Sequence, residues 1–240
     1  MTGDTMRQYL SFGGGVNSTA MLLLLTDRDE EFETVFVNHG GDYPETYAYV
    51  NYLQEQGFEI TEIIPNYRGC STLYDYCIQY KIIPITQFRW CTHYFKIVPY
   101  YDYIKPNLPC VSFIGFDAGE EKRVERSKTR KFRYKFEHQI KNKFPLFDAG
   151  IDRDGCIELI KEHGLKIPPK SGCYFCPFQS KNEYRQLFLQ HPDLYEKVEE
   201  LEHNRVATNE IYIRGNKPIR EIAMAHTPPL TTYFGDDHDG

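Results

Sequence analysis

The sequence lacks any long apolar run. The longest, residues 20–25, is far short of the roughly 18 residues that a membrane span needs. The first ten residues also lack the apolar segment of a secretory signal. The seven cysteines are odd in number, which does not fit a disulfide framework. We therefore expect a cytoplasmic protein that does not interact with membranes.

Basic residues are in the minority, because the net charge is −6. This excludes a protein covered all over with basic residues for nucleic acid. The exception is the basic segment, residues 122–143, which holds ten Lys or Arg and two Glu, with Phe132, Tyr134 and Phe136 interleaved. Two interpretations stay open: an ordinary solvated face, or a surface for an anion such as ATP or the backbone of tRNA or DNA.

Strand-like and helix-like patterns alternate in the first half of the chain. The predicted strands cover residues 9–12, 34–38, 59–64 and 111–116, and the predicted helices between them cover 18–26 and 44–56. This order predicts an α/β fold, a doubly wound parallel Rossmann-like sheet with its ligand at the carboxyl edge. Helical patterns at 154–163, 181–190 and 193–202 follow. We expect a nucleotide-binding domain at 1–178 and a helical extension at 179–240.

Three successive glycines, Gly13, Gly14 and Gly15, lie between the first predicted strand and the first predicted helix. Glycines allow the backbone to turn with its amides close to an anion, and the N-terminus of the following helix favours the same charge. We expect the hydroxyls of Ser18 and Thr19 to point to the same place. The loop lacks the lysine of GxxxxGK[ST] and the spacing of GxGxxG. It is either a phosphate loop of another kind or a purely structural turn.

The glycine loop resembles the PP-loop of the ATP pyrophosphatases, whose usual form is SGGxDS. Four further blocks resemble the phosphoadenosine-phosphosulfate (PAPS) reductase branch of these proteins. They are NHGGDYPET at 38–46 (its TGxxFPET motif), RWCTHYFKIVP at 89–99 (its Cys-Thr…Lys…Pro segment), GFDAGEEKR at 115–123 (its GxRxxE loop) and, in the same order, FPLF, GL and GCYFCP between 144 and 177. The blocks run through about three quarters of the chain.

The resemblance implies an adenine nucleotide alpha hydrolase-like fold that binds ATP and Mg²⁺. The implied nucleotide contacts are Ser11, Gly13, Gly14, Gly15, Asn17, Ser18, Thr19, Asn38, Gly40, Asp42, Glu45, Gly115, Lys122 and Arg123. The implied catalytic residues are Asn17, Ser18, Lys96 and Cys91. Asp42 or Glu45 would hold Mg²⁺ or its waters, and the adenine would lie near Val37 and Asn38.

The chain departs from the family patterns in two places. The loop has Gly13 for Ser and Asn17 for Asp, and the C-terminal ECGxH segment with the catalytic cysteine of sulfonucleotide reductases is absent. This favours an ATP-dependent sulfurtransferase that resembles the iron–sulfur tRNA thiolases and the DNA phosphorothioation enzymes. Such an enzyme would adenylate a substrate and transfer sulfur to it from a donor, with help from a metal or iron–sulfur cluster bound by cysteines. A homodimer is also an expected state. A sulfonucleotide (APS or PAPS) reductase-like enzyme and a non-catalytic nucleotide-binding subunit are the alternatives.

Three cysteines fall in the matched blocks. Cys173 and Cys176 form a Cys-x-x-Cys turn between Gly172 and Pro177, and Cys91 lies far from them in sequence. Three thiolates would bind a 4Fe–4S cluster with one open iron, or zinc with His93 as the fourth ligand. Unmetallated thiols are the third interpretation. We expect Cys110 and Cys156 to be small buried hydrophobes, and Cys70 and Cys77 to be structural.

Overall fold

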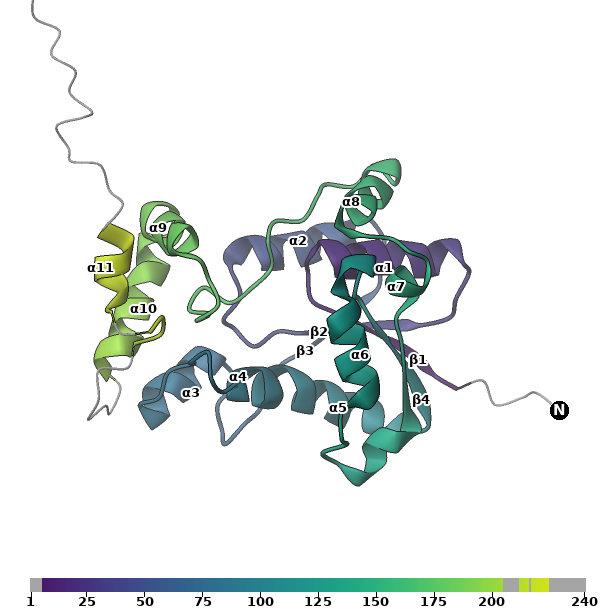
Figure 1. The fold of residues 1–240 in the computed structure, drawn as a ribbon, viewed down its shortest axis with the longest axis horizontal. Helices are drawn as coiled ribbons and strands as arrows, with labels where there is room; N and C mark the ends of the chain where they lie inside the picture. Colours follow the sequence, from purple (N-terminus) through teal and green to yellow (C-terminus); the bar gives the residue numbers. More distant parts are fainter. Residues whose placement is uncertain (1–5, 205–211, 216, 225–240) are drawn as a thin grey trace, which may run out of the picture. The chain divides into compact units, whose positions relative to one another are not determined.

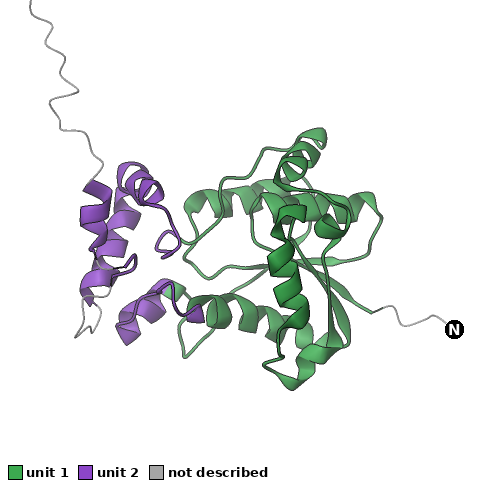
Figure 2. Cartoon of the chain, in the orientation of Figure 1, with its two compact units in different colours: residues 1–73, 91–173 green, residues 74–90, 174–240 purple. Residues whose placement is uncertain are grey.

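The computed structural model describes residues 6–204, 212–215 and 217–224. The chain divides into two compact units (Figure 2). Unit 1 comprises residues 1–73 and 91–173, and unit 2 comprises residues 74–90 and 174–240. The division after Cys173 lies close to the predicted domain boundary at residue 178. The assignment of residues 74–90 to the second unit has no counterpart in the prediction.

Unit 1 is built on a sheet of parallel strands. The strands are β1 (Gln8–Phe12), β2 (Glu33–Val37), β3 (Ile60–Ile63), β4 (Cys110–Ile114) and β5 (Ile140–Lys143). Their order is β3-β2-β1-β4-β5, and each neighbouring pair is parallel. The chain therefore winds outward from β1 in one direction and from β4 in the other. This confirms the predicted doubly wound fold and places its switch point between β1 and β4.

The helices of unit 1 cover both faces of this sheet. They are α1 (Val16–Asp27), α2 (Pro44–Glu55), α4 (Trp90–Thr92, which begins one residue before the unit), the π-helix η1 (His93–Ile97), α5 (Val98–Ile104), η2 (Lys105–Asn107), η3 (Ala118–Glu120), α6 (Glu121–Thr129), η4 (Lys135–Gln139), α7 (Pro145–Asp148) and α8 (Arg153–Glu162). Figure 1 shows α1 and α2 on one side of the sheet and α5 on the other. No described helix is long and apolar enough to cross a membrane.

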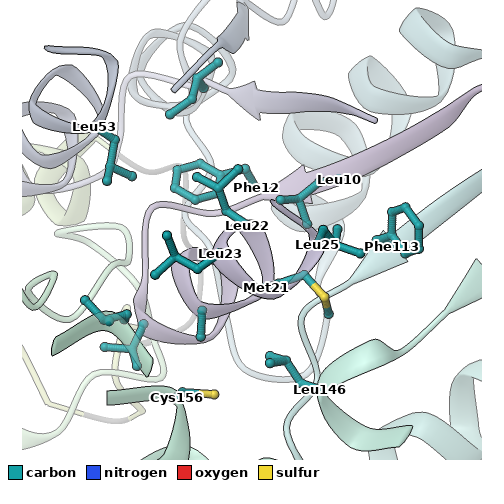
Figure 3. Packing of buried hydrophobic residues seen from close by; sticks show 14 of the residues in the cluster. Leu10, Phe12, Met21, Leu22, Leu23, Leu25, Leu53, Phe113, Leu146 and Cys156 are labelled. Carbon is teal, nitrogen blue, oxygen red and sulfur yellow. The ribbon is translucent and has the colours of Figure 1, made fainter. Parts of the chain in front are cut away.

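The core follows the alternation of side chains along the strands. Leu10 and Phe113 point to the face where α1 packs, and they join Met21, Leu23 and the thiol of Cys156 (Figure 3). Their neighbours in the strands point to the opposite face and pack with α5; these are Tyr9, Val35 and Cys110. Both faces of the sheet are therefore buried, as expected for a parallel sheet.

Two parts of unit 1 differ from the sequence prediction. β5 lies inside the basic segment, where no strand was predicted, because Lys141 and Lys143 interrupt any apolar pattern. The helices between β3 and β4 were also not predicted. The basic segment is therefore not one continuous surface, and Lys143 extends over the Phe113 ring at 5.4 Å.

Unit 2 is helical and has its own core. It contains α3 (Leu73–Tyr80, whose first residue belongs to unit 1), α9 (Lys181–Gln190), α10 (Pro192–Asn204) and α11 (Ile219–Met224). Phe175 and Tyr184 are fully buried, and the Phe175 ring meets Tyr74 of α3 edge-on at 6.3 Å. The buried Glu202 carboxylate accepts the backbone N–H groups of Ile213 (3.1 Å) and Ile219 (2.8 Å).

Candidate nucleotide site

The loops that follow β1 and β4 meet at the switch point of the sheet. Ser11 of β1 pairs with Ile114 of β4, so both strands end at the same edge. A Cβ at Gly115 would lie 3.3 Å from the carbonyl oxygen of Asn17, so the two loops pack backbone against backbone. A ligand of an open α/β sheet binds at such a point.

The three glycines of the loop have different surroundings. Gly14 has a φ of +69°, and a Cβ there would lie 2.8 Å from the Thr46 methyl group of α2. A Cβ at Gly15 would lie 2.4 Å from the Ser171 hydroxyl oxygen. A Cβ at Gly13 would meet no atom within 4 Å. Gly14 and Gly15 are therefore enclosed by their neighbours, whereas Gly13 faces open space beside the exposed Ser11.

The hydroxyls of Ser18 and Thr19 bond to the loop itself. Ser18 Oγ accepts the Gly15 N–H at 3.1 Å and donates to the Gly15 carbonyl at 3.0 Å. Thr19 Oγ1 is buried and donates to the same carbonyl at 3.0 Å. In this structure both hydroxyls stabilise the turn at the start of α1, as short hydroxyl side chains commonly do near helix ends. Their contact with a phosphate stays a prediction.

Asn17, at the start of α1, forms hydrogen bonds with three other side chains. Its Nδ2 donates to Asp117 Oδ2 at 2.8 Å and to Glu120 Oε2 at 3.2 Å. Its Oδ1 accepts from Arg153 at 2.7 Å. The amide thus joins α1 to the loop after β4 and to the first turn of α8.

Arg123 and Lys122 begin α6 beside this network. Arg123 forms an ion pair with Glu120, and its guanidinium lies 4.3 Å above the Phe116 ring. Lys122 is exposed. Arg123 is therefore held by a carboxylate and a ring, whereas Lys122 extends into solvent, and a phosphate contact by either residue stays a prediction.

A second polar cluster lies after β2. His39 is fully buried, and its Nδ1 accepts the Gly41 N–H at 3.2 Å. Its Nε2 lies 3.3 Å from Asp42 Oδ2, and Lys96 Nζ lies 3.5 Å from Asp42 Oδ1. Burial by itself would raise the pKa of Asp42, but Lys96 and His39 together outweigh it and lower the pKa to about 2. Asp42 is therefore ionised, enclosed and paired.

This pairing separates the two carboxylates predicted to hold Mg²⁺. The Asp42 side chain is only 2% exposed and is turned to Lys96, whereas Glu45 is exposed in the first turn of α2. Near the predicted adenine site, Asn38 Nδ2 donates to Glu62 at 2.9 Å and Asn38 Oδ1 accepts the Gly40 N–H at 3.0 Å. Gly40 has a φ of +69°, and a Cβ there would lie 2.7 Å from Thr72. Asn38 and Gly40 thus shape the end of β2.

Lys96 is carried by the π-helix η1. The wider turn of a π-helix is uncommon and often occurs at functional sites. η1 places the Phe95 ring in the core and the Tyr94 ring against Tyr67, with centroids 4.2 Å apart and planes within 14°. His93 Nε2 bonds to Tyr134 Oη at 3.0 Å. The Lys96 side chain, 44% exposed, therefore stands on a well-packed segment.

Most of unit 1 matches a known protein family. The profile of the phosphoadenosine phosphosulfate reductase domain matches residues 7–169, which is more than half of the chain. The chain belongs to this family. The resemblance predicted from the five sequence blocks is confirmed.

Individual relatives are more distant. Two uncharacterized proteins of Methanocaldococcus jannaschii, MJ0973 and MJ0066, are 24% and 27% identical over 200 and 206 residues. These alignments cover 78% and 79% of this chain but 45% and 40% of those proteins, so the chain spans less than half of their length. The solved structure of the PAPS reductase of Candida auris, a phosphate complex, is similar with a TM-score of 0.48 and 12% identity, over 68% of this chain and 75% of that chain.

The predicted metal site of this PAPS reductase family member is not shown by the described residues. Cys91 and Cys173 belong to unit 1 and Cys176 to unit 2. Among the residues that the structure describes, no three His, Cys, Asp or Glu side chains are grouped as metal ligands. The Cys173 backbone pairs with Asp42, and the Cys176 carbonyl accepts from Tyr184. The 4Fe–4S cluster and zinc therefore both stay predictions from the sequence.

The remaining cysteines are as predicted. Cys110 and Cys156 are fully buried, and burial raises the pKa of their thiols to about 11 and about 12. Cys70 and Cys77 are also buried, at 4% and 1% exposure. Together with Cys110 and Cys156 they are core residues.

Sequence reasoning missed the partners of the motif residues in this family member. Asp117, Glu120 and Arg153 surround Asn17, and His39 supports Asp42. One signal was present in the sequence, because Asp117 stands where the GxRxxE pattern has Arg. Nothing in the sequence marked Arg153, because it lies outside the matched blocks.

Proposed function

We propose that this protein binds ATP at the glycine loop and adenylates an oxygen atom of a second substrate, which a sulfur nucleophile then displaces. The main support is the open side of the loop. Gly14 and Gly15 are enclosed, Gly13 borders open space, and α1 begins immediately afterwards. Backbone amides and a helix N-terminus directed to one open place form a site for phosphate groups.

The proposed reaction has two displacements. The substrate oxygen attacks the α-phosphorus of ATP, the bond from this phosphorus to the bridging oxygen breaks, and pyrophosphate leaves with the electron pair. A hydrosulfide-class nucleophile then attacks the atom that bears the adenylated oxygen, and AMP leaves with that oxygen. Neither step needs an oxidant or a reductant. Adenylation serves to convert a poor leaving group into a good one.

In this reaction the side chains of the protein position the substrates and stabilise the charge on the phosphates. Lys96 carries a point charge that suits a phosphate, and Asp42 holds its ammonium group at 3.5 Å. Pre-arranged charge of this kind stabilises the transition state. Mg²⁺ would enter with the nucleotide phosphates, with Glu45 as the exposed carboxylate nearby in the sequence.

Two alternatives have specific support. Family membership favours a sulfonucleotide reductase-like enzyme, which would release sulfite from APS or PAPS when a thiol reductant is present. The amide at Asn17, in place of the aspartate of SGGxDS, favours a non-catalytic nucleotide-binding subunit. The three functions differ in what they release: pyrophosphate, sulfite or nothing.

The test is exchange of isotopic pyrophosphate into ATP, with titration of ATP binding in parallel. A Cβ at position 13 would meet no atom within 4 Å, so a leucine there should extend into the open space. Gly13→Leu should therefore abolish binding and exchange while the fold is kept. Gly13→Ser, which restores the usual family residue, is the matched control and should bind ATP. Binding without exchange would identify the subunit, and sulfite release from PAPS would identify the reductase. Unchanged ATP binding in Gly13→Leu would exclude the loop as the site.

We further propose that the basic segment binds the backbone of a nucleic-acid substrate. Phe132 is 61% exposed there, and the Tyr134 and Phe136 rings stack with centroids 5.4 Å apart. Lys131 and Lys135 are exposed and form no ion pair within the described part of the chain. An exposed ring and two partly buried rings beside exposed cations suit single-stranded tRNA or DNA.

Titration of a labelled single-stranded oligonucleotide at several salt concentrations tests this surface. Affinity should fall steeply with salt, and Lys131→Ala and Lys135→Ala should each reduce the slope by about one. Lys161→Ala, on α8, is the control and should leave the slope unchanged. A salt-independent affinity, or none at low salt, would identify the segment as a solvated face.

A further inference from the structure

We propose that the negative charge beside the glycine loop has moved from position 17 to the loop after β4. Asp117 and Glu120 supply, from the loop after β4, the carboxylate that the SGGxDS pattern carries at position 17. The loop then keeps its shape only with a neutral amide at Asn17. The effect on ATP rests on the proposed function, whereas the effect on the loop itself does not.

The hydrogen bonds of Asn17 match an asparagine and no other side chain of this size. Its NH₂ group has two donors, and both are used, toward Asp117 at 2.8 Å and Glu120 at 3.2 Å. Its carbonyl accepts from Arg153 at 2.7 Å. A carboxylate at position 17 keeps the bond from Arg153 but has no proton to donate to either acidic side chain.

The charges around Asn17 are balanced without it. Asp117, 6% exposed, and Glu120 are the two carboxylates, and Arg153 and Arg123 are the two guanidinium groups. The carboxylates are also fixed by backbone donors, because Asp117 Oδ1 accepts from Gly119 and Glu120 Oε2 accepts from Asp117. Two further ionisable groups lie near these carboxylates at the start of α8. They are Asp152, which caps the helix, and the Cys156 thiol, whose pKa burial raises to about 12.

Two departures from the family patterns thus meet in space. Position 17 has lost the negative charge of SGGxDS, and position 117 has a negative charge where GxRxxE has a positive one. The side chains are bonded at 2.8 Å although they are 100 residues apart in the sequence. Either change alone would leave an unmatched group at the loop, whereas together they form a complete network.

The exchange makes Asn17 a positioning residue. It is the second residue of α1, so its bonds fix the first turn of the helix relative to the loop after β4. The N–H groups of this turn are those expected to face the phosphates. Restoring the family aspartate by Asn17→Asp should therefore weaken ATP binding, whereas the family pattern alone would suggest an improvement.

The experiment compares Asn17→Asp with the swapped double variant Asn17→Asp/Asp117→Asn, in which the amide and the carboxylate change places. We measure unfolding by urea and ATP binding by calorimetry at about pH 8 and about pH 5. Asn51→Asp, which adds the same charge at an exposed site on α2, is the control. At about pH 8, Asn17→Asp should lower the unfolding midpoint and weaken ATP binding about tenfold. The double variant should regain most of the unfolding midpoint and most of the ATP affinity.

The pH dependence separates charge repulsion from a general packing defect. The introduced carboxyl faces two carboxylates, so its pKa in the folded state is raised above the unfolded value of about 4. The destabilisation is then complete at about pH 8 and fades as the pH falls toward 4. A midpoint for Asn17→Asp equal to that of wild type and Asn51→Asp, or a double variant no better than Asn17→Asp, would overturn the proposal. Absence of ATP binding by wild type would refute the proposed function and leave these unfolding results interpretable.

Discussion

Two carboxylates flank the glycine loop, and the chain neutralises them in different ways. Asp42 lies after β2, 4% exposed, and is matched by the positive charge of Lys96, with the His39 ring beside it. Asp117 lies after β4, 6% exposed, and is matched by the neutral amide of Asn17. Loss of a charge should destabilise the site around Asp42, whereas an added negative charge should destabilise the site around Asp117. Similar burial of the same side chain therefore produces opposite sensitivities to mutation.

The largest expected effect is loss of the Asp42 carboxylate. Asp42→Ala should lower the free energy of unfolding by about 3 kcal/mol, because it removes the carboxylate that His39 and Lys96 share. His39 is fully buried, so water cannot replace this partner. Asp42→Asn keeps the size and a hydrogen-bonding oxygen and should cost clearly less. Urea denaturation measures both variants, and equal stability of Asp42→Ala and wild type would show that the ion cluster does not stabilise the fold.

The glycine loop between the two clusters gives the next effect. Gly14→Ala combines a positive φ with a Cβ 2.8 Å from the Thr46 methyl group, and should destabilise the protein by about 2 to 3 kcal/mol. Gly13→Ala meets no atom within 4 Å and should be nearly neutral. Thermal unfolding of the pair checks this. Similar melting temperatures would contradict the different surroundings of the two glycines.

Acid should affect the Asp42 side of the loop more than the other side. The pKa of Asp42 is lowered to about 2 from 3.8, so its stabilising contribution is present above about pH 4 and is lost as the pH falls from 4 to 2. The shift corresponds to about 2 kcal/mol at neutral pH. Urea titrations across this range should show a shallower loss of stability in Asp42→Asn than in wild type. Parallel curves would assign the acid sensitivity to other groups.

The smallest effect is expected on the exposed side of the Asn17 network. Arg153→Gln keeps a donor for the Asn17 carbonyl and removes one charge, so the cost should be less than about 1 kcal/mol. High salt should reduce the difference further. Chemical denaturation at low and high salt measures it. A cost above 2 kcal/mol would mean that Arg153 is as important to this network as Lys96 and His39 are to Asp42.

The sheet was predictable because its strands are strongly apolar and end in glycines. β1, β2 and β4 carry buried hydrophobic runs, and the loops after them contain Gly13, Gly40 and Gly115. β5 was not predictable. It is an edge strand of sequence Ile-Lys-Asn-Lys, and its place is set by pairing with β4. The local hydrophobic pattern predicts the central strands, whereas the position of the edge strand β5 depends on its pairing with β4.

The candidate site also has a part that the sequence predicts and a part that it does not. The glycines and Lys96 belong to sequence blocks that the family shares, so the sequence marked them as site candidates. The partners of Asn17 come from positions 100 to 136 residues away, and no spacing rule connects them. The π-helix that carries Lys96 was also not predicted, because its register depends on how Phe95 and Tyr94 pack.

The path of the chain through unit 2 has a consequence for biosynthesis. α3 is made early, yet its partners come near the end of the chain: Tyr74 bonds to Glu200, and the Ile78 carbonyl accepts from Asn204, each 126 residues later. The ribosome therefore delivers the whole parallel sheet before α3 finds its permanent neighbours. Since nascent domains generally fold as they emerge, the Tyr74 and Ile78 contacts of α3 are expected to form after those of the sheet.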